Sequence, residues 1–143
     1  MHTRRIVVRT RILLLAALWT LIAAPSVLGA QNVGLKIRVP FPFTIANITL
    51  DAGEYVMSPI GDRALRIQPM GGRAHSITVV TNPVTSNERP KLGNLIFTCY
   101  EDHCFLSQFW MNEQYFGHEL PKSEAERRLA ADTRDYQIAV LRF

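Results

Sequence analysis

Apolar and polar residues alternate in short runs along most of the chain beyond its first thirty residues. In residues 33–39, for example, Val, Leu and Ile occupy every second position, and two basic residues lie between them. A two-residue period places the apolar side chains on one face of a half-buried β-strand. Turn signals containing Gly, Pro, Asp or Asn separate the runs. Strands are therefore predicted at residues 33–39, 48–50, 54–58, 64–68, 76–81, 94–100, 104–110 and 136–143.

The regular spacing of these short strands is typical of an all-β protein, either an antiparallel sandwich or a small barrel. About seven to nine strands are expected, because each one ends at a turn signal after only a few residues. Residues 31–143 have the length of a single domain with one hydrophobic core. Pro40 and Pro42 interrupt regular pairing around Phe41 and Phe43, and we expect these two rings to close one end of the core from an irregular stretch.

Residues 94–110 are expected to form a central hairpin. Cys99 and Cys104 would lie opposite each other, and their pairing sets the register. Bulky apolar residues occur on both faces of this hairpin, so both faces are expected to be covered. The predicted pairs are Thr98 with Phe105, Phe97 with Leu106, Ile96 with Ser107 and Leu95 with Gln108.

One helix interrupts the strand pattern, at residues 123–131. Ser123 and Glu126 form a capping box, in which each side chain satisfies a backbone N–H of the other residue. Glu124 and Arg128 are four residues apart and support the same helix as an ion pair. The chain is then expected to return as a closing strand at residues 136–143.

The first thirty residues carry the pattern of a secretory signal peptide. Residues 1–11 contain four arginines and no acid, residues 12–24 are thirteen apolar or small residues in succession, and small residues end the segment near Ala30. That run is short for a bilayer-spanning helix, which needs about 20 residues. We expect cleavage near Ala30, export to the periplasm or exterior, and no stable membrane anchor afterwards. The alternatives are an uncleaved anchor and, for the route, a twin-arginine signal at Arg4 and Arg5.

Removal of this segment changes the charge of the protein. The whole chain has 16 Lys and Arg and 12 Asp and Glu, and four of the arginines but none of the acids lie in residues 1–30. The mature chain therefore has 12 of each and no formal net charge. A nucleic-acid-binding protein needs a basic excess to replace phosphate counterions, so nucleic acid is not an expected partner.

Cys99 and Cys104 are the two cysteines of the chain. In an oxidising compartment, a pair on either side of a turn predicts a disulfide. The alternatives are two free thiols, or a metal site that His103 and His118 would complete. Adjacent residues of a strand point to opposite faces, which disfavours a shared ion at His103 and Cys104. No metal ligand is therefore assigned.

No motif fixes a catalytic activity. His118 and Glu119 begin the zinc-protease pattern H-E-x-x-H, but Lys122 replaces the second His, and Pro121 breaks the helix that the pattern requires. The sequence contains neither a G-x-S-x-G nucleophile elbow nor a Walker phosphate loop. No catalytic residue and no cofactor are assigned.

Aromatic residues gather late in the chain, within residues 105–116. Trp and Tyr beside amide side chains can stack on sugars, and they can hydrogen-bond sugars or a partner protein. The alternative is that these rings fill the core. The candidate binding surface comprises Trp110, Asn112, Gln114, Tyr115, Phe116 and His118.

Four segments carry a resemblance to known proteins: VPFPF at 39–43, LDAGEY at 50–55, FLSQFW at 105–110 and ELPKSEAE at 119–126. Together they resemble a family of small exported β-rich bacterial proteins without an assigned activity. The resemblance implies an exported β-rich domain followed by a short helix, and it brings no catalytic residues. The family usually has proline at the position of Asp51, and its pattern does not include the cysteine pair.

These observations predict a non-catalytic binding or structural module of the bacterial envelope or exterior, with an unknown protein or a saccharide as its partner. One alternative is a carrier of small apolar ligands with a cavity inside a closed barrel. A second is an exported hydrolase without a recognisable motif.

Overall fold

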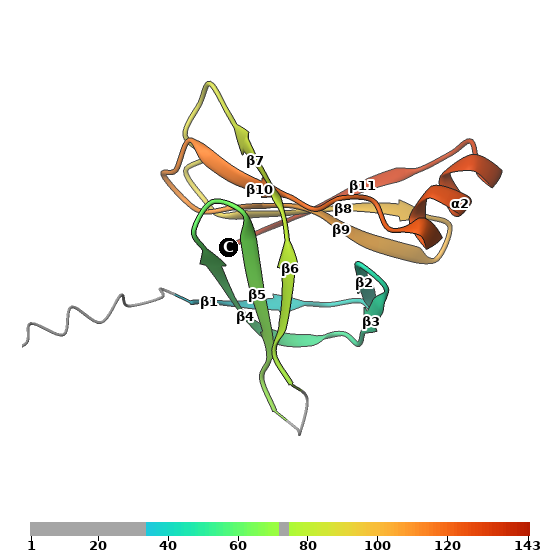
Figure 1. Ribbon diagram of the computed structural model, residues 1–143, viewed down its shortest axis with the longest axis horizontal. Helices are drawn as coiled ribbons and strands as arrows, with labels where there is room; N and C mark the ends of the chain where they lie inside the picture. Colours follow the sequence, from blue (N-terminus) through green and yellow to red (C-terminus); the bar gives the residue numbers. More distant parts are fainter. Residues whose placement is uncertain (1–33, 72–74) are drawn as a thin grey trace, which may run out of the picture. The chain divides into compact units, whose positions relative to one another are not determined.

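The computed structural model describes residues 34–71 and 75–143. These residues form two β-sheets and one α-helix (Figure 1). The predicted signal peptide, residues 1–30, lies outside the described residues. Within the described ranges, no helix has the length and apolar character needed to cross a membrane.

The smaller sheet contains four antiparallel strands in the order β1–β4–β5–β6. Its strands alternate between the core and solvent, as the sequence pattern predicts. In β5, Leu65 and Ile67 are fully buried, whereas Arg66 and Gln68 are exposed. The strands are β1 (Leu35–Val39), β4 (Gly53–Ile60), β5 (Ala64–Pro69) and β6 (Ile77–Val80).

The larger sheet contains seven strands, five of which follow the order β11–β8–β9–β10–β7. The other two, β2 and β3, form a hairpin, and β2 pairs with β9 in parallel at Thr44 and Phe105. The strands are β2 (Phe43–Ile45), β3 (Ile48–Leu50), β7 (Asn82–Thr85), β8 (Asn94–Tyr100), β9 (His103–Trp110), β10 (Phe116–Glu119) and β11 (Gln137–Arg142).

Side chains from both sheets form one core. The ring of Phe97 on β8 contacts Phe41 and Phe43 edge-on, with centroids 5.1 and 5.5 Å apart. Phe43 is almost completely buried and Phe41 packs against the core, so the expected contribution of both rings to the core is confirmed. Phe43 begins strand β2, however, and does not lie in an irregular stretch as expected. Two sheets around one core make this a β-sandwich, and the predicted all-β class is confirmed. The fully buried members of the core include Val39, Ile45, Met57, Leu65, Ile67, Leu95, Phe97 and Phe109.

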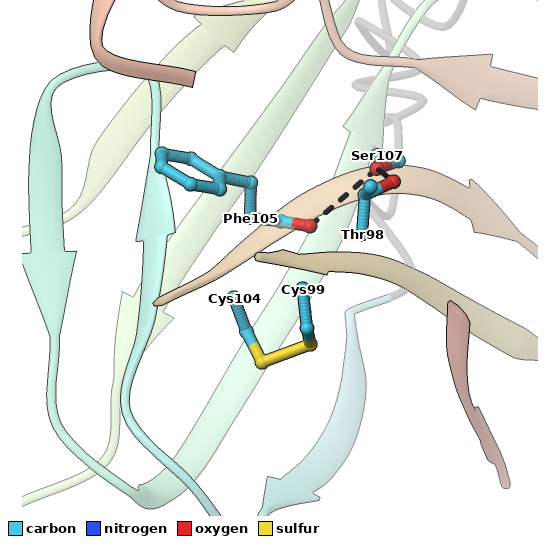
Figure 2. The surroundings of a disulfide bond; sticks show 5 residues. All are labelled: Thr98, Cys99, Cys104, Phe105 and Ser107. Carbon is cyan, nitrogen blue, oxygen red and sulfur yellow. Dashed lines mark hydrogen bonds between the residues drawn. A yellow bond between two sulfur atoms is a disulfide. The ribbon is translucent and has the colours of Figure 1, made fainter. Parts of the chain in front are cut away.

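The predicted disulfide is present in the β8–β9 hairpin. Cys99 lies opposite Cys104, with their Cα atoms 4.0 Å apart, and a sulfur–sulfur bond joins them (Figure 2). The predicted pairing of Phe97 with Leu106 is also confirmed. Because the two sulfurs are bonded to each other, neither is available as a metal ligand.

Farther along the hairpin, the predicted register is wrong by one residue. Ile96 lies opposite Gln108 instead of Ser107, and Leu95 lies opposite Phe109 instead of Gln108. Ser107 is therefore the extra residue of a β-bulge. The physical reason is burial: the unshifted register would put the Gln108 amide in the core, whereas the bulge puts the Phe109 ring there, fully buried.

The helix α2 (Glu124–Asp132) confirms the helix predicted at residues 123–131, displaced by one residue at each end. Ser123 is the N-cap, and its hydroxyl accepts the N–H of Glu126 at 3.1 Å. Arg128 forms an ion pair with Glu124. The local signals in the sequence therefore suffice to place this helix.

Three strands have no counterpart among the predicted ones: β2, β7 and β10. Each is only three or four residues long, too short for a two-residue period to stand out. β7 also contains Pro83, which has no N–H to donate. This proline is tolerated because β7 lies at the edge of the sheet. The described residues therefore contain eleven strands, more than the seven to nine that the sequence predicts.

We predict that replacing Cys99 and Cys104 together by serine lowers the free energy of unfolding by about 2 kcal/mol. The reason is that the disulfide closes a short loop and restricts the unfolded chain. Urea denaturation of the oxidised protein and the double variant measures the difference. Reduced wild-type protein is the control and should match the variant; equal stability of all three samples would contradict the prediction.

Candidate functional site

The larger sheet has an outer face that points away from the core. Alternation along β8 places Ile96, Thr98 and Tyr100 on this face. Thr98 and Tyr100 are nevertheless buried, because the chain leaving β10 and the helix α2 lie over this end of the sheet (Figure 1). Nζ of Lys122, just before α2, lies 3.5 Å from the Tyr100 hydroxyl.

The bulge holds this covering segment in place. The Leu120 N–H donates to the carbonyl of Ser107 at 2.8 Å, and Leu120 is buried. The Ser107 hydroxyl lies 2.6 Å from the hydroxyl of Thr98, on the side of the hairpin opposite the disulfide (Figure 2). The chain is therefore attached to the backbone of β9 three residues before Ser123, and the Leu120 side chain belongs to the core.

A hollow of about 570 Å³ lies between the covering segment and the sheet, and it opens to the surface. Its floor is made by β8 and β9, and its wall by the start of α2 and the segment before it. Its lining includes Ile96, Thr98, Ser107, Gln108, Lys122 and Glu126.

A second hollow, of about 330 Å³, continues along the same face toward the loop that follows β7. Ile96 and Gln108 line both hollows, so the two are adjacent over β8 and β9. We call the two hollows together the outer groove. The second hollow is lined by Ser86, Glu88, Arg89, Pro90, Asn94, Ile96, Gln108 and Trp110.

Glu126 supplies a buried carboxylate to the first hollow. Its side chain is only 4% exposed, and its Oε1 atom has no hydrogen-bond partner. Burial raises the pKa of this carboxyl, while Lys122 and the Ser123 backbone N–H act in the opposite direction. The capping interaction with Ser123 therefore stabilises the carboxylate, but the Oε1 atom remains without a hydrogen-bond partner.

Asn94 supplies a similar atom to the second hollow. Its Oδ1 is buried and has no partner. Two side-chain oxygens in the described ranges are buried without a partner, Asn94 Oδ1 and Glu126 Oε1, and the residues that carry them line one hollow each. Both are acceptors, so both would pair with hydrogen-bond donors of a ligand.

Trp110 is the predicted surface residue that the structure places in the groove. Its indole Nε1–H donates to Oε1 of Gln108 at 2.9 Å. The ring lies against Gly117 of β10, where a Cβ atom would come within 2.6 Å of it. The absence of a side chain at Gly117 therefore sets how closely this ring approaches the sheet.

The loop after Trp110 contacts the residues that form one wall of the second hollow. The Ser86 N–H donates to the Tyr115 carbonyl at 2.9 Å, and the Glu113 N–H donates to the Pro90 carbonyl at 2.7 Å. The guanidinium of Arg89 lies 4.5 Å from the centre of the Tyr115 ring. These contacts fix the loop at residues 86–90, which forms the wall of the second hollow.

The remaining members of the predicted surface lie elsewhere. Asn112 and Gln114 are exposed on the same loop, and Phe116 is 65% exposed at the start of β10. Gln114, Phe116 and His118 line a separate hollow beside Asp62. The structure therefore divides the six predicted residues between the groove, its supporting loop and this other hollow.

His118 is buried and forms a pair with Thr81. Its Nδ1 lies 2.8 Å from the Thr81 hydroxyl, and its ring packs against Phe109. Burial lowers the pKa of the imidazole, with a weaker opposing effect from Asp62. A Thr–His pair resembles a nucleophile and its base, but Thr81 is 2% exposed and beyond the reach of a substrate. The pair therefore stabilises the fold.

Asn82, Glu119 and Glu126 are groove residues that the sequence analysis did not single out as site residues. In the sequence, Glu126 is recognisable only as a member of the capping box with Ser123. Within the ranges that the structure describes, no group of three or more His, Cys, Asp or Glu is arranged to hold a metal ion.

Comparison of the chain with protein-family models, with curated proteins and with solved structures gives no match. The resemblance to small exported bacterial proteins therefore stays a prediction.

We predict that His118 makes the fold sensitive to acid. The unfolded imidazole takes up a proton near pH 6.5, whereas the buried imidazole resists protonation, so the free energy of unfolding should fall as the pH drops below about 6.5. Urea denaturation across this range should show a smaller decrease for His118→Gln. An equal decrease in both proteins would contradict the assignment.

We also predict that Glu126→Gln raises the free energy of unfolding by about 1 kcal/mol near pH 7, because a buried amide costs less to desolvate than a buried carboxylate. The gain should vanish as acid protonates the carboxyl in both states. Glu124→Gln, at an exposed position of the same helix, is the control, and it should gain nothing. A loss of stability for Glu126→Gln would mean that the carboxylate is paired.

Proposed function

We propose that the mature chain is an exported, non-catalytic binding module of the bacterial envelope or exterior, and that the outer groove is its ligand site. The observation that carries this proposal is that the two residues with an unpaired buried oxygen, Asn94 and Glu126, each line one hollow of the groove. An unpaired buried acceptor costs about 1–3 kcal/mol. A ligand that donates to both atoms recovers this cost on binding.

The polar groups in the groove favour binding over catalysis. The hydroxyls of Thr98 and Ser107 are hydrogen-bonded to each other, with their oxygens 2.6 Å apart. The oxygen of Gln108 accepts from Trp110. These groups are thereby held in fixed orientations, which suits recognition of a ligand's shape. The Thr81–His118 pair, which a hydrolase could use as nucleophile and base, is buried.

The packing between the sheets favours the binding module over an apolar carrier. The space that a carrier would use for its ligand is occupied by core side chains, including the edge-on cluster of Phe41, Phe43 and Phe97. The two groove hollows instead open on the outer face of one sheet.

Two observations support export. The first thirty residues have the charged, apolar and small order of a signal peptide. The disulfide between Cys99 and Cys104 is compatible with an oxidising compartment. Fractionation of the native host, followed by amino-terminal sequencing, tests this part: we expect the chain outside the cytoplasm and beginning near Gln31. A cytoplasmic protein beginning at Met1 would contradict it.

Thermal-shift measurements test the groove. The protein purified from its exported fraction is screened against saccharides, fatty acids and peptides. We expect one class to raise the melting temperature of the wild type and of Gln68→Ala, which alters an exposed residue of β5 on the other sheet. The shift should be lost in Gln108→Ala, because Gln108 lines both hollows. No shift with any class, or equal shifts in all three proteins, would overturn the proposal.

A further inference from the structure

We infer that the ligand of the outer groove is a neutral saccharide chain lying across β8 and β9. This inference rests on the proposed function, since it names the ligand class of the same site. It follows from the charge of the lining, the pairing of the floor strands, the free polar atoms and the aromatic ring.

The charges that line the groove nearly balance. Glu88, Glu119 and Glu126 are opposed by Arg89 and Lys122. A site for a polyanion such as a sulfated or phosphorylated chain would need a clear excess of basic groups. The nearly balanced lining instead matches a ligand without net charge.

The floor strands exclude a peptide bound by strand addition. β8 pairs with β11 on one side and with β9 on the other, and β9 pairs in turn with β10. Their backbone N–H and C=O groups are used in these ladders, whereas strand addition needs a free edge. A ligand on this floor therefore meets side chains only.

The side chains on the floor suit hydroxyl groups. A sugar hydroxyl both donates and accepts, so it can donate to Asn94 Oδ1 or Glu126 Oε1 and accept from a neighbouring amide. The oxygen of Gln108 is occupied by Trp110, which leaves the Gln108 NH₂ as the donor in the middle of the groove. Donor and acceptor positions thus alternate along the floor.

Trp110 provides a flat surface at one end. One part of its ring lies against Gly117, and the residue also lines the second hollow. An aromatic ring with one apolar face toward a groove can stack on the C–H face of a sugar ring. The hollows, about 570 and 330 Å³, each lie within the range of about 300–1,000 Å³ for ligand sites, so together they hold several linked sugar rings.

The mature protein offers a direct readout of this site. The chain has two tryptophans, and Trp19 lies in the predicted signal peptide. Trp110 is then the single tryptophan of the mature chain, and its fluorescence reports on the groove itself.

The experiment screens the exported protein on an array of neutral and anionic glycans and then titrates the best soluble glycan while the fluorescence of Trp110 is recorded. We expect neutral glycans to bind and to change the emission. Glu126→Ala and Asn94→Ala, both checked for folding by circular dichroism, should weaken binding at least tenfold because each removes the acceptor oxygen, whereas Gln68→Ala should bind like the wild type. Trp110→Ala, followed by calorimetry, should show a similar loss.

The possible outcomes distinguish a failure of the saccharide inference from a failure of the proposed binding function. Binding of neutral glycans that is lost in the groove variants supports both. Binding of anionic glycans or peptides, lost in the same variants, overturns the saccharide inference and leaves the proposed function intact. Glycan binding that the groove variants do not change overturns the inference, and a groove that responds to no ligand class overturns both.

Discussion

The β-bulge at Ser107 determines which side chains of the β8–β9 hairpin enter the core and which lie on its outer face. Leu106 and Phe109 both enter the core because one extra residue lies between their positions in the ladder. The same shift turns Gln108 outward. Without the bulge, an amide would be buried among the rings of the core at a cost of about 1–3 kcal/mol.

The bulge also determines where the helix lies. The Ser107 carbonyl accepts from the Leu120 N–H, which holds the chain beside β9 up to the point where it leaves β10. Ser123 then starts α2 with its capping hydrogen bond, and the third residue after it, Glu126, is carried into the buried angle between helix and sheet. A capping glutamate usually lies in water. Here its burial is a consequence of the attachment point of the preceding segment, and the unpaired oxygen follows from that burial.

Whether a feature depends on local or on long-range interactions explains which features the sequence predicts. The disulfide, the first hairpin pairs and the helix depend on residues a few positions apart, so spacing and capping signals are sufficient for them. The bulge depends on whether Gln108 or Phe109 is buried, which is a competition that only the packed core decides. The short strand β10 and the groove depend on contacts between Ser107 and Leu120, which are far enough apart that no local pattern records them. The aromatic and amide neighbours of Trp110 single it out in the sequence, whereas Glu126 is singled out only as a helix-capping residue.

The arrangement also favours a groove that is formed before any ligand arrives. The floor strands are paired on both sides, and the disulfide links them on the face opposite the groove. The far wall is fixed by two backbone hydrogen bonds and by Arg89 on the Tyr115 ring, so the exposed aromatic loop acts as a support for the wall. A preformed site loses less conformational entropy on binding. Weak individual contacts to hydroxyl groups can therefore add up to useful affinity on this surface, because little of their free energy is spent on ordering the protein.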